Sequence, residues 1–404
     1  MSATLPSPFP NSPFASDSAT KPGHGEVVLS LLPPANPSLS KLSYRYPLKL
    51  VSRMPSVTLN SKYPPSATTP VHLYLLTYGG GLLPGDYIDV SITLRPRTRL
   101  VINTPQGTTK IFKTRSRDES GDKYKPHNGG DPGNNNGNAD GSQQNLDVCI
   151  RSEAGLCFLP DPCTPFEDSR YEQIQVFTVL HDEEGDNITS NHNQSNNTHH
   201  PPNTADINSA KPDKRPSLCV LDWVTEGRSA RGENWSFHSW KGRNEIWIQR
   251  GKSGRRKLLV RDSVILDDGQ SSSPSLSSSS TGSNEPMTST TLPIRTRTDP
   301  HKILGTLILY GPLFDDLGAF FMEEFSSQPR IGGRNWSASA PTTQQKQREC
   351  AKDVIWTAAR VRSDIVLVKF GAKDYQTARD WLGGLLRQEG SIEREFGPEA
   401  YGSL

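Results

Sequence analysis

The segment at residues 77–113 constrains the fold more than any other part of this 404-residue chain. It opens with a glycine cluster that leads into a Pro-Gly-Asp turn at residues 84–86. At residues 87–94 apolar and polar side chains alternate, and this two-residue period indicates a strand with one buried face. A second short strand is expected at residues 100–102, after a turn-like Arg-Pro-Arg. The segment therefore predicts a hairpin in an antiparallel sheet.

Strand-like segments of similar length recur along most of the chain. They are β-branched or aromatic and are bounded by Gly, Pro, Asp or Ser, as the aromatic segment at residues 235–240 illustrates. Good helical periodicity occurs only at residues 312–325 and 374–388, and Asp374 is a plausible N-cap for the second helix. The sequence therefore predicts a mainly-β fold of many short, mostly antiparallel strands, with about two α-helices near the C-terminus.

Composition limits how much of the chain can fold. Only 33% of the residues are hydrophobic, and glycine and proline contribute 33 residues each. Segments rich in Asn, Gly, Ser and Pro cannot offset their own ordering entropy by burying apolar surface. We expect a disordered tail at residues 1–22, a single large β-rich domain at 23–390 and a C-terminal tail at 391–404. Within the domain, we expect disordered inserts near residues 115–144, 182–216, 269–298 and 326–349.

Charge and hydropathy exclude several kinds of partner. The formal net charge is +2, from 45 basic and 43 acidic residues, so no global field favours nucleic acid or an acidic membrane surface. No apolar run approaches the roughly 20 residues that span a bilayer. The N-terminal segment lacks the charged and apolar regions of a secretory signal. We therefore expect a cytoplasmic protein that binds neither nucleic acid nor a membrane.

The chemistry-bearing residues form no recognisable catalytic motif. The five cysteines include no Cys-x-x-Cys pair, which argues against a disulfide framework and a zinc ribbon. No Gly-x-Ser-x-Gly, glycine-rich dinucleotide loop or His-Glu-x-x-His occurs. We therefore predict no catalytic residue and no enzymatic activity. Two alternatives stay open: a β-rich hydrolase with an unrecognised active site, and a structural β-rich interaction protein.

Several motifs follow one another in a recognisable order. After the glycine-rich turn and the alternating strand, residues 104–110 read Thr-Pro-Gln-Gly-Thr-Thr-Lys and lead to Phe112. Residues 159–166 contain Leu-Pro-Asp-Pro and Pro-Phe, and residues 231–233 read Arg-Gly-Glu before the aromatic segment. This order resembles the UreD family of urease accessory proteins, also called UreH.

The resemblance implies a function in assembling the dinickel centre of apo-urease. The protein would dock on apo-urease and on a UreF-type helical accessory protein, which recruits a UreG-type nickel-binding GTPase. Nickel would be a transient cargo, and no cofactor would be tightly bound. The chain would be a scaffold that performs no covalent chemistry, and its polar interior residues would supply weak oxygen and nitrogen ligands.

Candidate site residues lie within these motifs. For a polar path that nickel follows, the candidates are Asp86, Arg231 and Glu233. The candidate binding positions are Gly80, Gly81, Gly85, Gln106, Lys110 and Asp161. Simpler structural interpretations compete with some of these assignments. Asp86 would satisfy the Pro-Gly-Asp turn, and Arg231 with Glu233 would form a surface ion pair that contributes little to stability.

Overall fold

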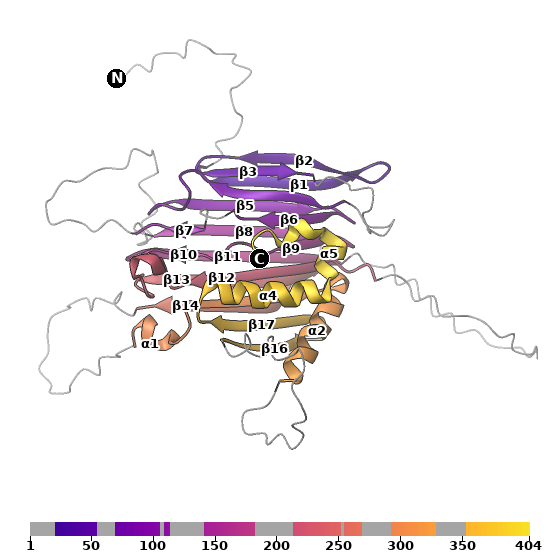
Figure 1. Ribbon diagram of the computed structural model, residues 1–404. Helices are drawn as coiled ribbons and strands as arrows, with labels where there is room; N and C mark the ends of the chain where they lie inside the picture. Colours follow the sequence, from indigo (N-terminus) through magenta and orange to yellow (C-terminus); the bar gives the residue numbers. More distant parts are fainter. Residues whose placement is uncertain are drawn as a thin grey trace, which may run out of the picture.

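The computed structural model describes residues 21–54, 69–105, 109–113, 141–181, 213–251, 254–268, 292–328 and 353–404. Within these ranges the fold is mainly β, as the sequence predicts (Figure 1). The longer strands are β1 (His24–Leu32), β2 (Asn36–Tyr44), β3 (Leu48–Arg53), β4 (Val71–Thr77), β5 (Tyr87–Leu94), β6 (Arg99–Asn103), β8 (Ser142–Ile150), β9 (Gly155–Phe158), β11 (Arg170–His181), β12 (Ser217–Thr225), β13 (Ser239–Arg250), β14 (Lys257–Asp267), β15 (Ile303–Tyr310), β16 (Val354–Arg362) and β17 (Ile365–Ala372). The two-residue strands are β7 (Lys110–Ile111) and β10 (Thr164–Pro165). The α-helices are α1 (Ile294–Thr298), α2 (Asp315–Ser326), α4 (Tyr375–Glu389) and α5 (Ser391–Phe396), and the 3-10 turns are η1 (Ser229–Arg231), η2 (Pro312–Phe314) and η3 (Pro398–Tyr401).

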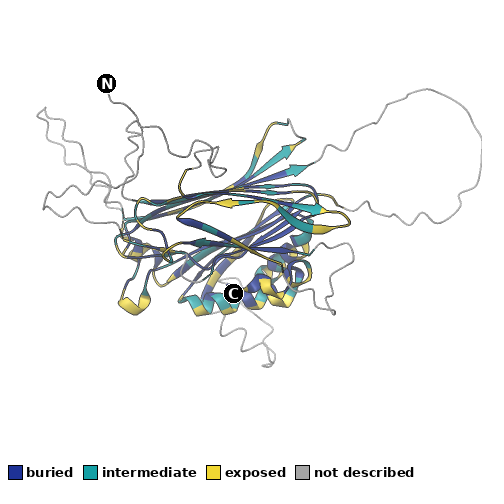
Figure 2. Cartoon of the chain, turned by 90° about the horizontal axis from the view of Figure 1, so that it is seen from above, coloured by how far each residue is buried: buried dark blue, intermediate teal, exposed yellow. Residues whose placement is uncertain are grey.

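Two large sheets pack face to face. The seven-stranded sheet has the order β14-β13-β11-β8-β5-β1-β2, and the eight-stranded sheet has the order β16-β17-β15-β12-β9-β6-β4-β3. Figure 2 shows the two layers of strands with the helices on one outer side. Helices α2, α4 and α5 cover the outer face of the eight-stranded sheet, so its central strands are buried on both faces (Figure 1). The fold is therefore a β-sandwich with one helical outer layer.

The predicted hairpin at residues 87–102 is wrong. Strands β5 and β6 lie in different sheets, because the chain crosses from one layer to the other at residues 95–98. Arg97 takes a positive φ of 64° in this corner, and the hydroxyl of Thr98 donates to the carbonyl of Arg95 at 2.7 Å. The next strand of the same sheet, β8, therefore returns in the direction of β5 and pairs with it in parallel.

The predicted preference for antiparallel pairing is also wrong, for the same reason. The chain alternates between the sheets from β5 to β13, so neighbours within each sheet run parallel. Among the described strands, parallel pairs outnumber antiparallel ones, eight to six. Of the strand predicted at residues 235–240, only 239–240 belong to a strand, β13; residues 235–238 are irregular, and Trp235 takes a positive φ of 55°.

Two hydrophobic clusters hold the layers together. The first lies between the sheets, where inward positions of both sheets alternate with outward ones. Ile88, Val90, Ile92 and Leu94 belong to it, so the alternating pattern of β5 is confirmed as one buried face. The second cluster joins the eight-stranded sheet to α2, α4 and α5.

The C-terminal segment belongs to this second cluster. Residues 391–404, which the sequence assigns to a tail, form α5 and η3 and bury Phe396 and Tyr401 against the helical layer. All four expected inserts include described residues, since 142–144 begin β8, 213–216 precede β12, 294–298 form α1 and 326–328 follow the body of α2. Residues 1–20 of the expected N-terminal tail and most residues of the expected inserts lie outside the described residues.

Helix α4 begins where the sequence places it. The carboxylate of Asp374 accepts a hydrogen bond from the backbone N–H of Thr377 at 2.7 Å, which is the N-cap interaction. We expect Asp374→Ala to lower the free energy of unfolding by about 1 kcal/mol, because that N–H loses its acceptor. Urea denaturation measures the change. Asp374→Ser, which restores a capping oxygen, is the control, and equal stability of the alanine and wild-type proteins would contradict the assignment.

Candidate functional site: a polar core between the sheets

The glycine-rich turn and the Thr-Lys segment contact each other. The N–H of Leu82 donates to the carbonyl of Lys110 at 2.8 Å, and the N–H of Phe112 donates to the carbonyl of Leu82 at 3.0 Å. A Cβ on Gly81 would lie 2.6 Å from the Lys110 carbonyl oxygen, so only glycine permits this close approach. Glycine at position 81 thus positions β7 rather than a ligand.

The Pro-Phe motif joins β7 from the other side. The N–H of Thr164 donates to the carbonyl of Thr109, and the N–H of Phe166 donates to that of Ile111, each at 2.9 Å. The guanidinium of Arg228 lies 3.9 Å from the centre of the Phe166 ring, within the range of a cation–π interaction. Motifs from four distant parts of the sequence therefore meet at one place.

The candidate residues of the glycine-rich turn serve the turn itself. The carboxylate of Asp86 accepts from the N–H of Leu83 at 2.8 Å, and the N–H of Asp86 donates to the carbonyl of Leu83 at 2.9 Å. Gly80 and Gly85 have φ angles of 74° and 87°, in the left-handed region that residues with a side chain rarely adopt. Asp86 is not among the lining residues of the three cavities described below. Gln106 lies outside the described residues.

Glu233 pairs with Arg228 instead of Arg231. Its carboxylate accepts from the backbone N–H and the Nε of Arg228, each at 2.7 Å, and from the Nη2 of the same residue. Burial raises the pKa of Glu233, but these bonds to Arg228 outweigh it, so the pKa is lowered overall. Arg231 ends η1 and is exposed. Arg228 and Glu233 fix the loop beside the first cavity, and neither lines it.

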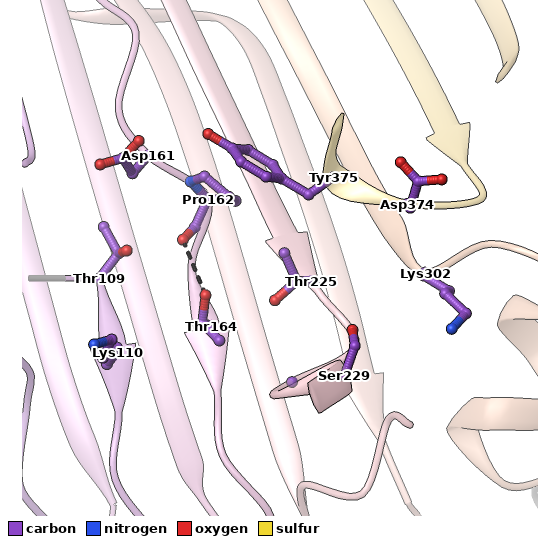
Figure 3. Close-up of a pocket in the computed structure, with 11 residues that line it drawn as sticks. Thr109, Lys110, Asp161, Pro162, Thr164, Thr225, Ser229, Lys302, Asp374 and Tyr375 are labelled. Atoms are coloured by element: carbon purple, nitrogen blue, oxygen red, sulfur yellow. Dashed lines mark hydrogen bonds between the residues drawn. The ribbon is translucent and has the colours of Figure 1, made fainter. Parts of the chain in front are cut away.

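The first cavity has a volume of about 440 Å³ and lies where the motifs meet (Figure 3). Its lining is mostly polar and comprises Thr109, Lys110, Asp161, Pro162, Thr164, Thr225, Gly227, Ser229, Lys302, Asp374 and Tyr375. Two of the predicted binding residues, Lys110 and Asp161, are thereby brought together at one cavity. Figure 3 shows the hydroxyl end of Tyr375 turned towards Asp161.

Asp161 lines both the first cavity and a second, smaller one. It is only 7% exposed, and its backbone N–H donates to the hydroxyl of Thr104 at 2.9 Å. Burial raises the pKa of this carboxyl from 3.8 to about 6, while a hydrogen bond with Ser403 and the charge of Arg379 lower it less strongly. Asp161 is therefore a carboxylate that exchanges a proton near neutral pH.

The second cavity lies between the sheets and has a volume of about 40 Å³. Its polar lining includes Asp161, Tyr171, Gln173, Gln175 and Asp222, which together with Asn244 we call the polar core. A space of this size holds a few water molecules or a small cation. Inward positions of a sandwich are ordinarily apolar, so a polar group of this extent is a specific feature of the interior.

Hydrogen bonds connect most of the polar core. The hydroxyl of Tyr171 donates to Gln173 Oε1 at 3.2 Å, and Gln173 Nε2 donates to Asp222 Oδ1 at 3.0 Å. Asn244 Nδ2 donates to Asp222 Oδ2 at 2.7 Å. Burial raises the pKa of Asp222, and its two amide donors oppose that shift. The buried oxygens Gln175 Oε1 and Asn244 Oδ1 have no hydrogen-bond partner within the described part of the chain.

Asp222 also lines a third cavity, of about 300 Å³. This cavity lies beside β14 and β16, which are the edge strands of the two sheets. Ile355 on β16 is 64% exposed here, and Val264 on β14 forms part of the same lining. Asp161 is therefore shared by the first and second cavities, and Asp222 is shared by the second and third. The three cavities form a series from the first cavity to the sheet edges.

The ligands available in the polar core are oxygen atoms. Among the described residues, no group of three or more His, Cys, Asp or Glu side chains is arranged to hold a metal ion. Cys163 lines the second cavity, and burial raises its pKa, which keeps the thiol protonated. Carboxylate and amide oxygens without a thiolate provide weak, exchangeable ligation of a divalent cation.

Sequence reasoning missed most of the polar core. Asp161 was singled out, but Asp222, Gln173 and Asn244 were not. One sequence pattern could have identified Asp222. This residue alternates with Val220 and Val224 on the face of β12 that points between the sheets, where a polar residue is unexpected.

Fold and site together define a class of protein: a β-sandwich with a buried, hydrogen-bonded polar core between its two sheets. In the described part of the chain, no helix is long and apolar enough to cross a membrane. The family model described as UreD urease accessory protein matches residues 25–182 and 210–396. The chain therefore belongs to the UreD family of urease accessory proteins, and its role is in urease maturation.

Curated proteins from fungi and plants are similar along much of the chain. An uncharacterized urease accessory protein ureD-like of Schizosaccharomyces pombe is 29% identical over 339 residues, covering 84% of each chain. Urease accessory protein 4 of Cryptococcus neoformans var. grubii is 27% identical, covering 84% of this chain and 86% of the relative. Urease accessory protein D of Arabidopsis thaliana is 30% identical over 60% of this chain and 59% of its own.

Proposed function

We propose that this protein is a non-catalytic scaffold that passes Ni²⁺ through its polar core to apo-urease. The observation that carries the proposal is the sharing of Asp161 and Asp222 between successive cavities. Two buried carboxylates at these positions place acidic oxygens where successive cavities adjoin, so a cation that moved between the cavities would meet them. Unpaired oxygens of Gln175 and Asn244 offer further ligands along the way.

Weak ligation suits a transfer function. A site of thiolates or clustered imidazoles would hold nickel tightly, because sulfur and nitrogen ligands bind Ni²⁺ more strongly than oxygen ligands do. Oxygen ligands that already have protein partners exchange more easily, since Gln173 and Asn244 recover their bonds to Asp222 when the ion leaves. The chain itself makes or breaks no covalent bond in this proposal.

The partners follow from family membership together with this route. We propose that apo-urease receives the ion, and that a UreF-type helical protein links the chain to a UreG-type GTPase that delivers nickel. Nickel is then a cargo and not a resident cofactor. The assembly works in the cytoplasm, and it needs neither nucleic acid nor a membrane.

Complementation of cells that lack the protein tests the proposal. The wild-type chain should restore urease activity and urease-bound nickel, and it should co-purify with apo-urease. Nickel content is measured on the purified urease, so that poor expression of urease is not mistaken for poor maturation. Full urease activity in the cells without the protein would overturn the proposed function.

A further inference from the structure

A lysine side chain lies at the solvent-exposed side of the third cavity, here called its mouth. Lys369 on β17 is the only lysine or arginine that lines this cavity among the described residues. Its Nζ lies 2.5 Å from Asp262 Oδ1, and its side chain is 44% exposed, so the ammonium stands between solvent and the interior. Asp222 lies in the lining of the same cavity.

Most of the third cavity is lined by apolar side chains, but the partners of its two charged residues each carry a buried oxygen without a hydrogen-bond partner among the described residues. Asp262 is 7% exposed, and its Oδ2 atom has no hydrogen-bond partner within the described residues. Asn244 donates to Asp222, and its own Oδ1 has no hydrogen-bond partner in the part of the chain that the structure describes. Within the described ranges, the hydrogen bonds that Asp222 accepts come from the neutral amides of Gln173 and Asn244. In the described structure, Lys369 is thus the one lysine or arginine of the cavity lining beside two buried aspartates, Asp222 and Asp262.

We infer that Lys369 is a cationic placeholder that controls how tightly the polar core holds a divalent cation at this mouth. The inference rests on the proposed function and concerns the same route. An ammonium bound to Asp262 repels a second cation near Asp222, and the metal must displace it or pass it. The lysine stem is flexible and half exposed, so it can swing into solvent without opening the sandwich.

A static role is the alternative to be tested. Lys369 would then only neutralise Asp262, as a lysine at the rim of any acidic interior does. The two roles differ in metal affinity. A placeholder lowers the affinity of the core for Ni²⁺, so its removal tightens binding, whereas a purely structural partner leaves nickel affinity unchanged.

The experiment titrates NiCl₂ into the purified full-length chain by isothermal titration calorimetry. Lys369→Gln removes the charge but keeps an N–H donor for Asp262, and Lys369→Arg keeps the charge. We expect Lys369→Gln to bind Ni²⁺ about tenfold more tightly than the wild type, and Lys369→Arg to resemble the wild type. In cells, Lys369→Gln should release less nickel to urease and so lower its activity.

A matched control is available at the end of the same strand. Lys373 pairs with Asp353, follows β17 directly and lines none of the three cavities. Lys373→Gln should leave nickel affinity unchanged. If Lys369→Gln fails to fold, as judged by circular dichroism, Lys369→Met is titrated against the same criteria.

The outcomes separate this inference from the proposed function. Equal nickel affinity of Lys369→Gln and the wild type would overturn the placeholder role, even if Asp222→Asn blocks urease activation. Normal activation by Asp222→Asn would instead overturn the route through the polar core. Tighter binding by Lys369→Gln together with reduced activation would support both.

Discussion

Replacing Asp222 by asparagine is expected to reduce urease activation by about 10- to 100-fold, the loss typical when a group that tunes a metal ligand is removed. The change deletes the negative charge that the second and third cavities share. The side chain keeps its shape, and Asn244 can turn its amide to offer the unpaired Oδ1 to the new donor. We therefore expect the fold to persist. Urease activity and urease-bound nickel, measured in complemented cells, check the loss of transfer.

Glu245→Gln is the matched control for this substitution. Glu245 is also a buried carboxylate, 6% exposed, but its partners are Arg261 at 2.9 Å and the Nε1 of Trp247 at 2.8 Å. It is not among the lining residues of the first, second or third cavity. Activation should survive in Glu245→Gln. Wild-type activation by a folded Asp222→Asn protein would remove Asp222 from the route.

Local features of the fold could be predicted from the sequence because they depend on neighbouring residues. The alternation of Ile88, Val90, Ile92 and Leu94 fixes a strand with one buried face, whichever strand pairs with it. The cap at Asp374 depends on a residue only three positions away. Both predictions are confirmed, and so is the mainly-β class.

Pairing between strands could not be predicted in the same way. A turn such as residues 95–98 can either fold a strand back onto its neighbour or carry the chain to a second sheet. The choice depends on what covers the buried face of β5, and those residues lie far away in the sequence. The hairpin interpretation therefore failed although both strands were placed correctly.

The candidate site was predictable only in part, for a related reason. Asp161 stands in a short sequence motif, and the structure does place it at a cavity. Asp222 and Asn244 come from strands of opposite sheets, and only the sandwich brings them within hydrogen-bonding distance. Glu233 pairs with a residue five positions away instead of the nearer Arg231, because Arg228 also packs on Phe166.

Asp161→Asn is expected to make the protein more stable at pH 7.5 and less able to activate urease. The pKa of Asp161 is 3.8 when exposed and about 6 in the folded protein. The folded state therefore binds the extra proton between these pH values, and the ionised carboxylate costs stability above pH 6. The upper limit of this cost at pH 7.5 is about 3 kcal/mol. Asparagine removes the cost, and it also removes an oxygen ligand that carries charge.

Urea denaturation across a pH series checks the stability change. The advantage of Asp161→Asn should be largest at pH 7.5 and should vanish below pH 3.8, where the wild-type carboxyl is protonated in both states. Asp213→Asn is a control of opposite sign, because a hydrogen bond from Arg215 lowers the pKa of Asp213. That variant should lose stability at neutral pH relative to acid.

The protonation of Asp161 should also affect nickel transfer. A protonated Asp161 is a poor nickel ligand, so activation by the wild type in vitro should fall as the pH drops through about 6. Asp161→Asn should activate weakly at every pH and so lack this dependence. A variant that is no more stable than the wild type at pH 7.5 would show that Asp161 is better solvated than its burial implies. Normal activation by that variant would show that nickel does not depend on this carboxylate. Greater stability with lost activation would mean that the chain retains a costly buried charge because transfer requires it.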